Sequence, residues 1–389
     1  MALSRGVGCT RSLPRRDVAA QGSVRAATFK RRLRPRRKQI LVTAKPPVVL
    51  LLMRAESLAG HSIEHIIETL APLLSGNFEV RVVRVPCQSR GIPRCARNLI
   101  FTARQRADII HVTGDIHYCA LAVRRKRCIL TIHDFCSLYR LKGFKKCIFS
   151  TLWYSLPLRW APYVTVISGE TKRQLEHYFP SAAVKVEVIP NCVDEAFKKN
   201  YRTTRSGTRG LRVLQVGTGS NKNLERLAAA ASGLPLQLRI IGPLSGHQRT
   251  LLRSLDLDWT SAQQLSGEEV VREYRDSDLL VFASTYEGFG LPIVEAQVIG
   301  LPVITSKMAP MTEVAGDAAL FVDPYSEKEI RAALEQILRS PDLARRLSDQ
   351  GRRNAERFDA KMVADRYADV YTRIAAGRHR RVAGNDLGG

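Results

Sequence analysis

The sequence lacks the cysteine patterns of a metal site or a disulfide framework. Its eight cysteines are scattered along the chain, and none of them forms a C-x-x-C pair. This distribution is typical of small buried thiols in a reducing compartment. We therefore expect neither a metal ion nor any other cofactor.

Long hydrophobic runs are missing from the start of the chain. The longest apolar run in the first 60 residues is Val48 to Met53, whereas a membrane-spanning helix needs about 20 apolar residues. The run is also too short for a secretory signal. The sequence therefore predicts a cytoplasmic protein.

Acidic residues are scarce at the N-terminus. Residues 1–38 contain ten Arg and two Lys but a single acid, Asp17, and they contribute +11 of the formal net charge of +25. Such a segment repels itself, which predicts a disordered arm. Its composition equally suits an organelle transit peptide or an over-long start of the chain. No motif of a nucleic-acid reader accompanies the charge, so we expect no specific nucleic-acid partner.

The chain contains enough apolar sequence for two cores. Hydrophobic residues make up 45% of its 389 residues, and one domain usually takes about 100–200 residues. Short runs rich in Val and Ile alternate with segments of helical period, as in βαβ units. We predict an α/β fold of two doubly wound, Rossmann-like parallel-sheet domains, at 39–200 and 201–358, that face a cleft.

The expected strands form two sets on either side of a breaker-rich linker at Lys198–Gly210. They are Val48–Met53, Phe78–Val85, Ala107–Val112, Cys128–His133, Tyr163–Ser168 and Val184–Pro190 in the first set, and Leu211–Val216, Leu236–Ile241, Leu279–Ala283, Pro302–Thr305 and Ala319–Val322 in the second. An apolar stripe through Val363, Tyr367 and Ile374 predicts a C-terminal helix at 361–376 that packs back on the first domain.

The most informative motif follows the strand expected to end at Ala283. It reads Glu287-Gly288-Phe289-Gly290-Leu291-Pro292-Ile293-Val294-Glu295, a glycine-containing loop before a helix whose first position suits Pro292. The free amides and dipole of that helix favour a phosphate or an oxygen-rich sugar. Glu287 can accept hydrogen bonds from sugar hydroxyls, and Glu295 from the two hydroxyls of a ribose. The residues alone also permit a glycine-rich turn with two solvated glutamates.

Three other strand ends carry candidate site residues. Gly217 and Gly219 permit tight backbone geometry, and Lys222 offers a charge for a diphosphate, unless it is simply an exposed lysine. His133 ends a strand at the edge where ligands of such sheets bind, whereas we interpret His111, which also ends a strand, as structural. The backbone at Gly60 could meet the leaving phosphate or the acceptor. Further possible cleft or cap residues are Ser168, Gly169, Glu170, Pro190, Asn191 and Asp194.

The run from Glu287 to Glu295 resembles the E-x7-E motif of retaining glycosyltransferase family 4, whose fold is GT-B. The later segments Glu313-Val314-Ala315-Gly316 and Asp323-Pro324 also resemble that family, and the resemblance extends from about residue 45 to 375. It implies catalytic roles for Glu287 at the donor sugar, for Lys222 at the diphosphate and for His133, within Thr131-Ile132-His133-Asp134, at a sugar hydroxyl. The donor-binding residues that it implies are Gly217, Ser220, Gly288, Phe289, Gly290, Leu291 and Glu295.

The chain departs from the family pattern in two places. Related enzymes commonly carry an arginine shortly before the lysine, where this chain has Thr218, Gly219 and Ser220. The family often has two adjacent glycines in the first loop, where this chain has only Gly60. Either backbone amides and the Ser220 hydroxyl replace the arginine, or the donor is held more loosely.

The resemblance implies a glycosyltransferase, and we expect it to need no metal, because positively charged groups of the protein can stabilise the departing phosphate. It would move a sugar from a GDP- or UDP-sugar to a glycan, lipid-linked or polysaccharide acceptor, with retention of the anomeric configuration. Two alternatives stay open: a GT-B phosphorylase or sugar-nucleotide epimerase, and a catalytically inactive GT-B protein that binds nucleotides or nucleic acid. The missing arginine and the charge of +25 suit the inactive protein.

A basic segment in the first half suggests a membrane partner. Between Arg140 and Arg159 the chain has several Arg and Lys and no acid, interleaved with Phe144, Phe149, Trp153 and Tyr154. This composition suits peripheral contact with anionic lipid on the inner face of the membrane. It equally suits a basic helix whose aromatic side chains are core.

Overall fold

The computed structural model describes residues 45–56, 62–201 and 210–377. The expected basic arm at 1–38 lies outside the described residues. The loop with Gly60 and most of the expected linker lie outside them as well.

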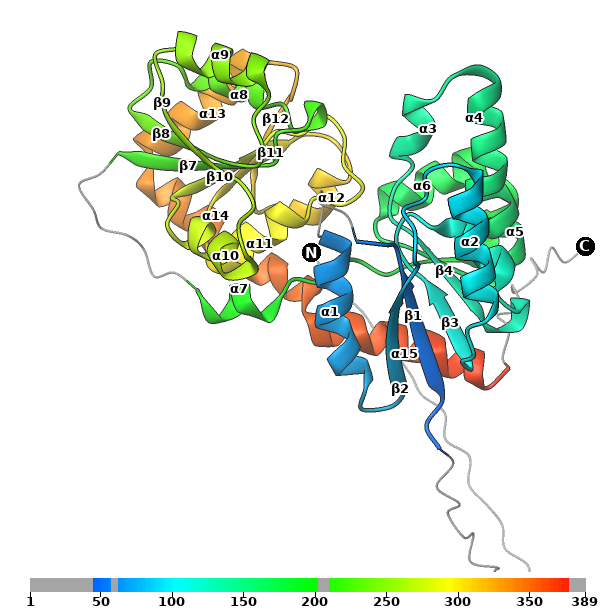
Figure 1. Cartoon of the computed structure of the whole chain (residues 1–389). Coiled ribbons are helices and arrows are strands. Elements are labelled where there is room, and N and C mark those ends of the chain that lie inside the picture. The colour runs from blue at the N-terminus through cyan, green and yellow to red at the C-terminus, as the bar shows by residue number, and fades with distance from the viewer. Residues whose placement is uncertain (1–44, 57–61, 202–209, 378–389) are drawn as a thin grey trace, which may run out of the picture. The chain divides into compact units, whose positions relative to one another are not determined.

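The first half of the chain forms a six-stranded sheet in the order β2-β1-β3-β4-β5-β6, in which all neighbouring strands are parallel (Figure 1). Every residue of β3, β4 and β5 is buried, because parallel sheets are covered on both faces. The strands are β1 (Val48–Met53), β2 (Glu79–Arg84), β3 (Ile109–Val112), β4 (Cys128–Ile132), β5 (Tyr163–Val166) and β6 (Val186–Val188).

Helices connect the strands of this sheet, and a further short helix, α7 (Glu195–Lys199), follows its last strand. The connecting helices are α1 (Ser62–Leu74), α2 (Ile92–Ala103), α3 (Cys136–Arg140), α4 (Gly143–Ser150), α5 (Leu156–Trp160) and α6 (Gly169–Tyr178). Short 3-10 turns occur at η1 (His117–Ala122), η2 (Arg125–Arg127) and η4 (Pro180–Lys185), and one π-helical turn, η3 (Thr151–Ser155), separates α4 from α5.

The second half forms another six-stranded parallel sheet, in the order β12-β11-β10-β7-β8-β9. The strand order reverses between β7 and β10, and ligands of such sheets bind at the carboxyl ends of the strands beside this reversal. The strands are β7 (Leu211–Val216), β8 (Leu236–Ile241), β9 (Asp258–Ala262), β10 (Leu279–Phe282), β11 (Val303–Ser306) and β12 (Leu320–Val322).

Several helices of the second half begin with a side-chain cap, such as the capping boxes formed by Ser245 and Gln248 and by Ser266 and Glu269. The helices are α8 (Leu224–Ala231), α9 (Gly246–Ser254), α10 (Gly267–Arg275), α11 (Leu291–Ile299), α12 (Met311–Ala315), α13 (Glu327–Arg339), α14 (Pro341–Ala355) and α15 (Ala360–Ala375). Two 3-10 turns, η5 (Ser220–Lys222) and η6 (Glu356–Phe358), lie among them.

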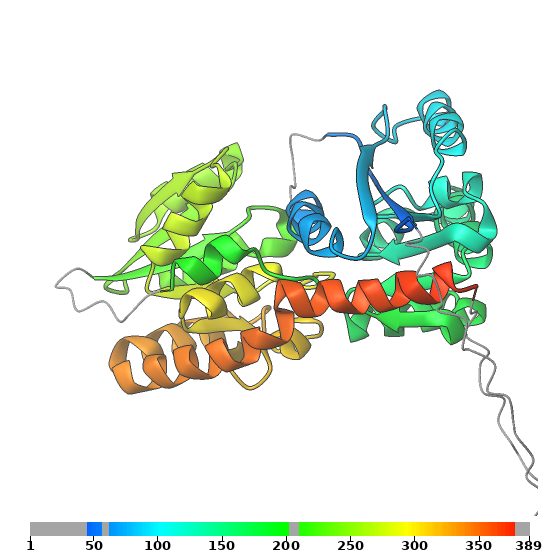
Figure 2. The ribbon, with the colours of Figure 1, turned by 90° about the horizontal axis from the view of Figure 1, so that it is seen from below.

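The C-terminal helix α15 returns to the first sheet, as the apolar stripe predicted. Figure 2 shows α15 lying along the first half of the chain. Val363, Tyr367 and Ile374 are buried in one cluster with residues of β1 and α1. The chain crosses between the two halves twice. The two crossing segments are linked by a hydrogen bond, in which the Val193 amide donates to the Phe358 carbonyl at 3.1 Å. The predicted α/β fold with two Rossmann-like sheets and a returning helix is therefore confirmed.

Several element boundaries differ from the prediction. The strand β9 was missed because most of its side chains are exposed or half-buried, so it carries no apolar run. The linker was placed too early, since Lys198 and Lys199 belong to α7. Pro292 is the second rather than the first residue of α11, which begins at Leu291, a shift within the usual uncertainty of helix ends.

Candidate active site

The loop after β7 is held by a buried glutamine. Gln215 is 1% exposed, and its side-chain amide donates to the carbonyls of Gly217 (3.1 Å) and Lys222 (3.0 Å). Gly217 has a φ of 88°, and a Cβ there would lie 3.0 Å from the Lys222 side chain. The loop therefore needs glycine at this position, and Lys222 folds back across it.

The loop after β10 is attached to the loop after β7. The amide of Thr285 donates to the Asn221 carbonyl at 2.8 Å, and the Asn221 side chain donates to the Tyr286 carbonyl at 2.9 Å. Because β7 and β10 are neighbours at the reversal of strand order, these bonds fix two strand ends against each other. The E-x7-E motif therefore lies beside the lysine loop.

Lys222 and Glu287 form an ion pair at this junction. The Lys222 Nζ lies 2.6 Å from the Glu287 Oε1, and the two side chains are only 21% and 14% exposed. Asn221 adds a longer hydrogen bond to the same oxygen, at 3.3 Å, and the ammonium lies 4.6 Å from the centre of the Phe282 ring. A cation and a carboxylate are thus placed together at the ligand-binding edge of the sheet.

Glu295 lies in α11, and its carboxylate accepts a hydrogen bond from Tyr274. The Tyr274 hydroxyl donates to the Glu295 Oε2 at 2.5 Å. Burial raises the pKa of Glu295 to about 7, and the nearby charge of Asp194 adds to the shift, while the Tyr274 hydrogen bond and the charge of Lys222 oppose it. The carboxylate therefore changes protonation near neutral pH. No sequence pattern indicated Tyr274 as the hydrogen-bond partner of Glu295.

His133 follows β4 of the first sheet, and its Nε2 atom is buried without a hydrogen-bond partner among the described residues. Burial lowers the pKa of His133 to about 4, with the charge of Arg54 as a second cause and Glu64 opposing it. The imidazole is therefore neutral at neutral pH. Buried polar atoms are rarely left unpaired, so this nitrogen is available for a ligand.

The His133 backbone meets the E-x7-E loop. A Cβ on Gly288 would lie 2.5 Å from the His133 carbonyl oxygen and 3.0 Å from the Asp134 Cβ. The Phe135 amide also donates to the Tyr286 hydroxyl at 3.3 Å. Gly288 thus permits close contact between the two halves of the chain. The family resemblance had implied a different role for this glycine, as a donor-binding residue.

The remaining predicted site residues have varied surroundings. Ser220 is exposed, and Leu291 is half-buried. Gly290 has a φ of 104° just before α11. Phe289 is buried and packs edge-on against Phe358, with ring centres 5.6 Å apart, so its side chain supports the loop from the core. Gly60 lies outside the described residues.

His111 has a structural role, and Ser168 and Asp194 cap helices. The buried His111 is held by the hydroxyls of Tyr371 (2.7 Å) and Thr131 (2.6 Å), and burial lowers its pKa to about 3. Ser168 caps α6 by accepting from the Thr171 amide at 3.0 Å, and Asp194 caps α7. These findings confirm the structural interpretation of His111 and the two caps.

Sequence reasoning missed one carboxylate close to the charge of Asp134. Asp115 follows β3, and its Oδ1 accepts a hydrogen bond from the Trp153 indole at 3.0 Å. Burial raises the pKa of Asp115 to about 6, and the neighbouring charge of Asp134 adds to the shift. The only sequence signal was its place after a strand, because an isolated aspartate carries no motif.

The described residues contain neither a metal-binding cluster nor a membrane-spanning helix. No group of three or more His, Cys, Asp or Glu side chains within those residues could hold a metal ion. No helix among them is both long and apolar enough to cross a bilayer.

Two family models match adjacent parts of the chain. The model of glycosyltransferase family 4 matches residues 48–197, and the model of group 1 glycosyl transferases matches residues 198–354. The chain belongs to the group 1 glycosyltransferases. Its family membership agrees with the site, since the second model includes both Lys222 and the E-x7-E motif.

The chain is similar in sequence to two mannosyltransferases. It is 29% identical over 233 residues to the MMP alpha-(1->4)-mannosyltransferase of Mycolicibacterium hassiacum, which covers 56% of each chain. It is 27% identical over 278 residues to the O-antigen chain mannosyltransferase B of Escherichia coli, covering 64% of this chain and 71% of that protein. The glycosyltransferase thus spans about half the length of the first of these relatives.

A solved structure with the same fold contains a donor. The Anabaena protein HepE in complex with UDP-glucose has a TM-score of 0.66 and 17% identity, and the match covers 84% of this glycosyltransferase and 99% of HepE. Identity at this level shows the shared GT-B fold.

Proposed function

We propose that this glycosyltransferase moves a sugar from a GDP- or UDP-sugar to a hydroxyl of a glycan, lipid-linked or polysaccharide acceptor, with retention of the anomeric configuration. The observation that carries the proposal is the ion pair of Lys222 and Glu287 at the reversal of strand order, in a loop that touches the backbone of His133. The mannosyltransferase names of the relatives and the UDP-glucose in HepE support the donor and acceptor classes.

The donor would bind along the second sheet. The free amides at the start of α11, next to Gly290, favour the diphosphate, and Lys222 supplies a positive charge within reach of the same place. The Glu287 carboxylate would accept hydrogen bonds from the sugar hydroxyls, and the Glu295 oxygen not used by Tyr274 would accept one from the ribose.

The transfer breaks the bond between the anomeric carbon and the phosphate oxygen and forms a bond to the acceptor oxygen. Negative charge grows on the departing phosphate, where Lys222 and the α11 amides stabilise it. The acceptor proton leaves with the nucleoside diphosphate. The unpartnered Nε2 of His133 would hold a donor-sugar hydroxyl, so that the sugar is fixed while it reacts. This chemistry uses protein charges in place of a metal.

The test is thermal unfolding with a panel of nucleoside diphosphates and nucleotide-sugars, without added metal. A ligand that binds only the folded protein raises the unfolding temperature. We expect a rise with compounds of one base, either guanine or uracil, and a larger rise with one of its sugars. No rise with any compound, in a folded protein, would contradict the donor site. No contact among the described site residues favours the inactive alternative.

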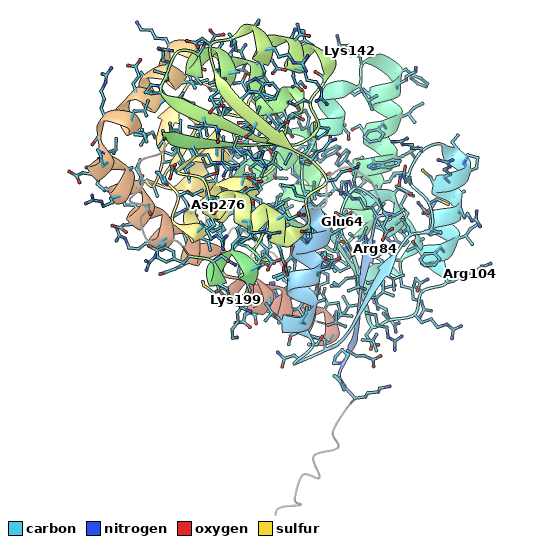
Figure 3. The ribbon with its side chains drawn as sticks, turned by 60° about the vertical axis from the view of Figure 1, so that its left-hand side comes forward. Glu64, Arg84, Arg104, Lys142, Lys199 and Asp276 are labelled. Carbon is cyan, nitrogen blue, oxygen red and sulfur yellow. The ribbon has the colours of Figure 1, made fainter. Side chains whose placement is uncertain are left out.

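We also propose that the segment 140–159 contacts an anionic lipid surface from the inner face of the membrane. Four exposed apolar side chains recur there at every fourth position, namely Phe144 (77% exposed), Ile148 (44%), Leu152 (47%) and Leu156 (38%). Lys142, which is labelled in Figure 3, Lys145 and Arg159 are exposed beside them. An exposed apolar stripe flanked by basic side chains suits a membrane interface.

The aromatic residues of this segment divide between the two earlier interpretations. Tyr154 is 1% exposed, and Trp153 packs against Tyr118 with ring centres 4.5 Å apart. Phe149 stacks on Trp153 at 4.9 Å. These three rings belong to the core of the first sheet, whereas Phe144 remains on the surface. The lipid contact would therefore rest on the stripe and the basic residues rather than on the whole aromatic set.

A further inference from the structure

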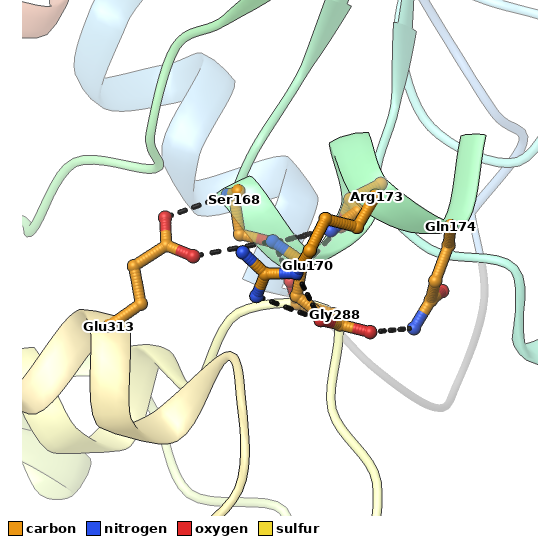
Figure 4. A network of polar contacts seen from close by, with 8 residues as sticks. Ser168, Glu170, Arg173, Gln174, Gly288 and Glu313 are labelled. Atoms are coloured by element: carbon orange, nitrogen blue, oxygen red, sulfur yellow. Dashed lines mark hydrogen bonds and ion pairs between the residues drawn. The ribbon is translucent and has the colours of Figure 1, made fainter. Parts of the chain in front are cut away.

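The first turn of α6 obtains two of its hydrogen-bond acceptors from the other half of the chain. Its third amide, that of Thr171, is capped by Ser168. Its first two amides, those of Gly169 and Glu170, donate to the Glu313 carboxylate at 2.7 and 3.2 Å (Figure 4). The amides at the start of a helix have no partner within the helix, and here a residue of α12, 144 positions away in the chain, satisfies them.

Several features favour this contact. A carboxylate at a helix N-terminus faces the positive end of the helix dipole, and hydrogen bonds to a charged acceptor are the stronger ones. The Glu170 side chain does not compete, because it is bonded to Arg173 and Gln174 (Figure 4). A Cβ on Gly169 would lie 2.7 Å from a Glu313 oxygen, so glycine leaves room for the carboxylate.

The same turn of α6 also holds the E-x7-E loop. The hydroxyls of Ser168 and Thr171 donate to the Gly288 carbonyl at 2.9 and 3.3 Å. Gly288 is the residue next to Glu287, and its α-carbon faces the His133 carbonyl too closely to leave room for a Cβ. Glu313, the start of α6, the Gly288 loop and His133 thus form one continuous set of contacts.

We propose that Glu313 is a positioning residue, which through the first turn of α6 holds the loop bearing Glu287 against His133. The inference rests on the proposed sugar transfer. Lys222, Glu287 and Glu295 all belong to the second half of the chain, so the donor site does not need Glu313 in order to form. The reacting arrangement does need it, because His133 belongs to the first half.

The expected consequence is a separation of two kinetic parameters. Glu313→Ala should lower kcat by about tenfold or more, equivalent to about 1.4 kcal/mol per factor of ten, and leave the dissociation constant of the donor nucleotide within about twofold. Glu313→Gln keeps one acceptor oxygen but loses the charge, so its kcat should lie between those of the natural chain and Glu313→Ala. Asp317→Ala is the matched control, because Asp317 is an exposed acid just after α12 and should leave both constants unchanged.

A double-mutant cycle tests the contact from its other side. Gly169→Ala places a methyl group against the Glu313 carboxylate and should lower kcat in the natural chain. In the Glu313→Ala background the methyl group meets no carboxylate, so the second substitution should cost little more. Contacting residues are non-additive in this way, whereas independent ones add.

Small-angle scattering with a saturating nucleoside diphosphate gives a readout that does not depend on turnover. Glu313→Ala should have a larger radius of gyration than the natural chain and the Asp317→Ala control.

An unchanged radius with an unchanged kcat would overturn the proposal, as would strictly additive effects of Gly169→Ala and Glu313→Ala. A loss of donor affinity equal to the loss of kcat would indicate a general structural role and would also overturn it. Absence of turnover in the natural chain would contradict the proposed transfer, while the scattering comparison would still decide the role of Glu313.

Discussion

Lys222 and Glu287 are 65 positions apart in the chain, yet the lysine Nζ lies 2.6 Å from the glutamate Oε1. The two strands that precede these residues are neighbours in the second sheet. The pair therefore forms at the one place in that sheet where a parallel α/β fold opens to a ligand.

Replacing the lysine should weaken nucleotide binding. In Lys222→Ala the diphosphate loses a positive charge, and the half-buried Glu287 carboxylate that remains repels it. We expect the affinity for the matching nucleoside diphosphate to fall by about tenfold or more, which is about 1.4 kcal/mol, as measured by titration calorimetry. Lys328→Ala removes an exposed lysine of α13 and serves as the control. A partial recovery of nucleotide affinity in Lys222→Ala/Glu287→Gln would support repulsion by Glu287. Equal losses of affinity in Lys222→Ala and in the control would refute the role of Lys222.

Donor affinity should rise with pH through neutrality. Burial raises the pKa of Glu295 to about 7, so the side chain is mostly protonated at about pH 6 and mostly ionised at about pH 8. If only the ionised form accepts the ribose hydroxyl, the apparent affinity should increase about tenfold over that interval. Glu295→Gln cannot titrate, and its affinity should be lower and flat with pH. An equally steep pH dependence in Glu295→Gln would show that another group is responsible.

A single methyl group at Gly288 should impair turnover. The added Cβ would lie 2.5 Å from the His133 carbonyl oxygen, and backbone cannot move aside as a flexible side chain can. We expect Gly288→Ala to lower the free energy of unfolding by about 1–3 kcal/mol, as overpacking does, and to lower kcat. Gly246→Ala is the control, because nothing lies within 4 Å of the Cβ it would add. If both variants have the kcat of the natural chain, the contact between Gly288 and His133 has no role in turnover.

Vesicle binding should depend on the exposed stripe and on lipid charge. We expect the protein to co-sediment with vesicles containing phosphatidylglycerol and to bind pure phosphatidylcholine less, since basic side chains are attracted to anionic lipid. Phe144→Ser should reduce binding by about tenfold, given the value of burying an aromatic side chain. Ile92→Ser is the control, because Ile92 is 85% exposed and belongs to α2 rather than to the stripe. Equal binding by the two variants would argue against the stripe as the contact surface.

Sequence patterns predicted those parts of the fold that depend on local composition. The strands β1, β7 and β8 have the predicted bounds. The apolar residues form a continuous run in β1 and alternate with polar residues in β8, and both patterns are typical of strands. The edge strand β9 has exposed side chains and no such run, so it could not be found. The apolar stripe of α15 predicted its packing, because a helix must cover its hydrophobic face.

The chemistry of the site was harder to derive than its location. The sequence identified Glu287, Glu295 and Lys222, but their pairing depends on which strands are neighbours. The raised pKa of Glu295 depends on burial and on Tyr274, a residue from another helix. The interaction of Glu313 with α6 could not be predicted either, because nothing in a local pattern shows that a carboxylate 144 positions away will cap a helix.

The most direct test of the proposed function is the release of nucleoside diphosphate from GDP- and UDP-sugars, measured for the natural chain and for Glu287→Gln in the presence of candidate acceptors. We predict that one donor is consumed and that Glu287→Gln lowers kcat by about a hundredfold, as the loss of one stabilising group in an active site commonly does. The donor affinity of Glu287→Gln should change much less than its kcat. Turnover by Glu287→Gln equal to that of the natural chain would contradict the assignment of this glutamate to the reacting centre.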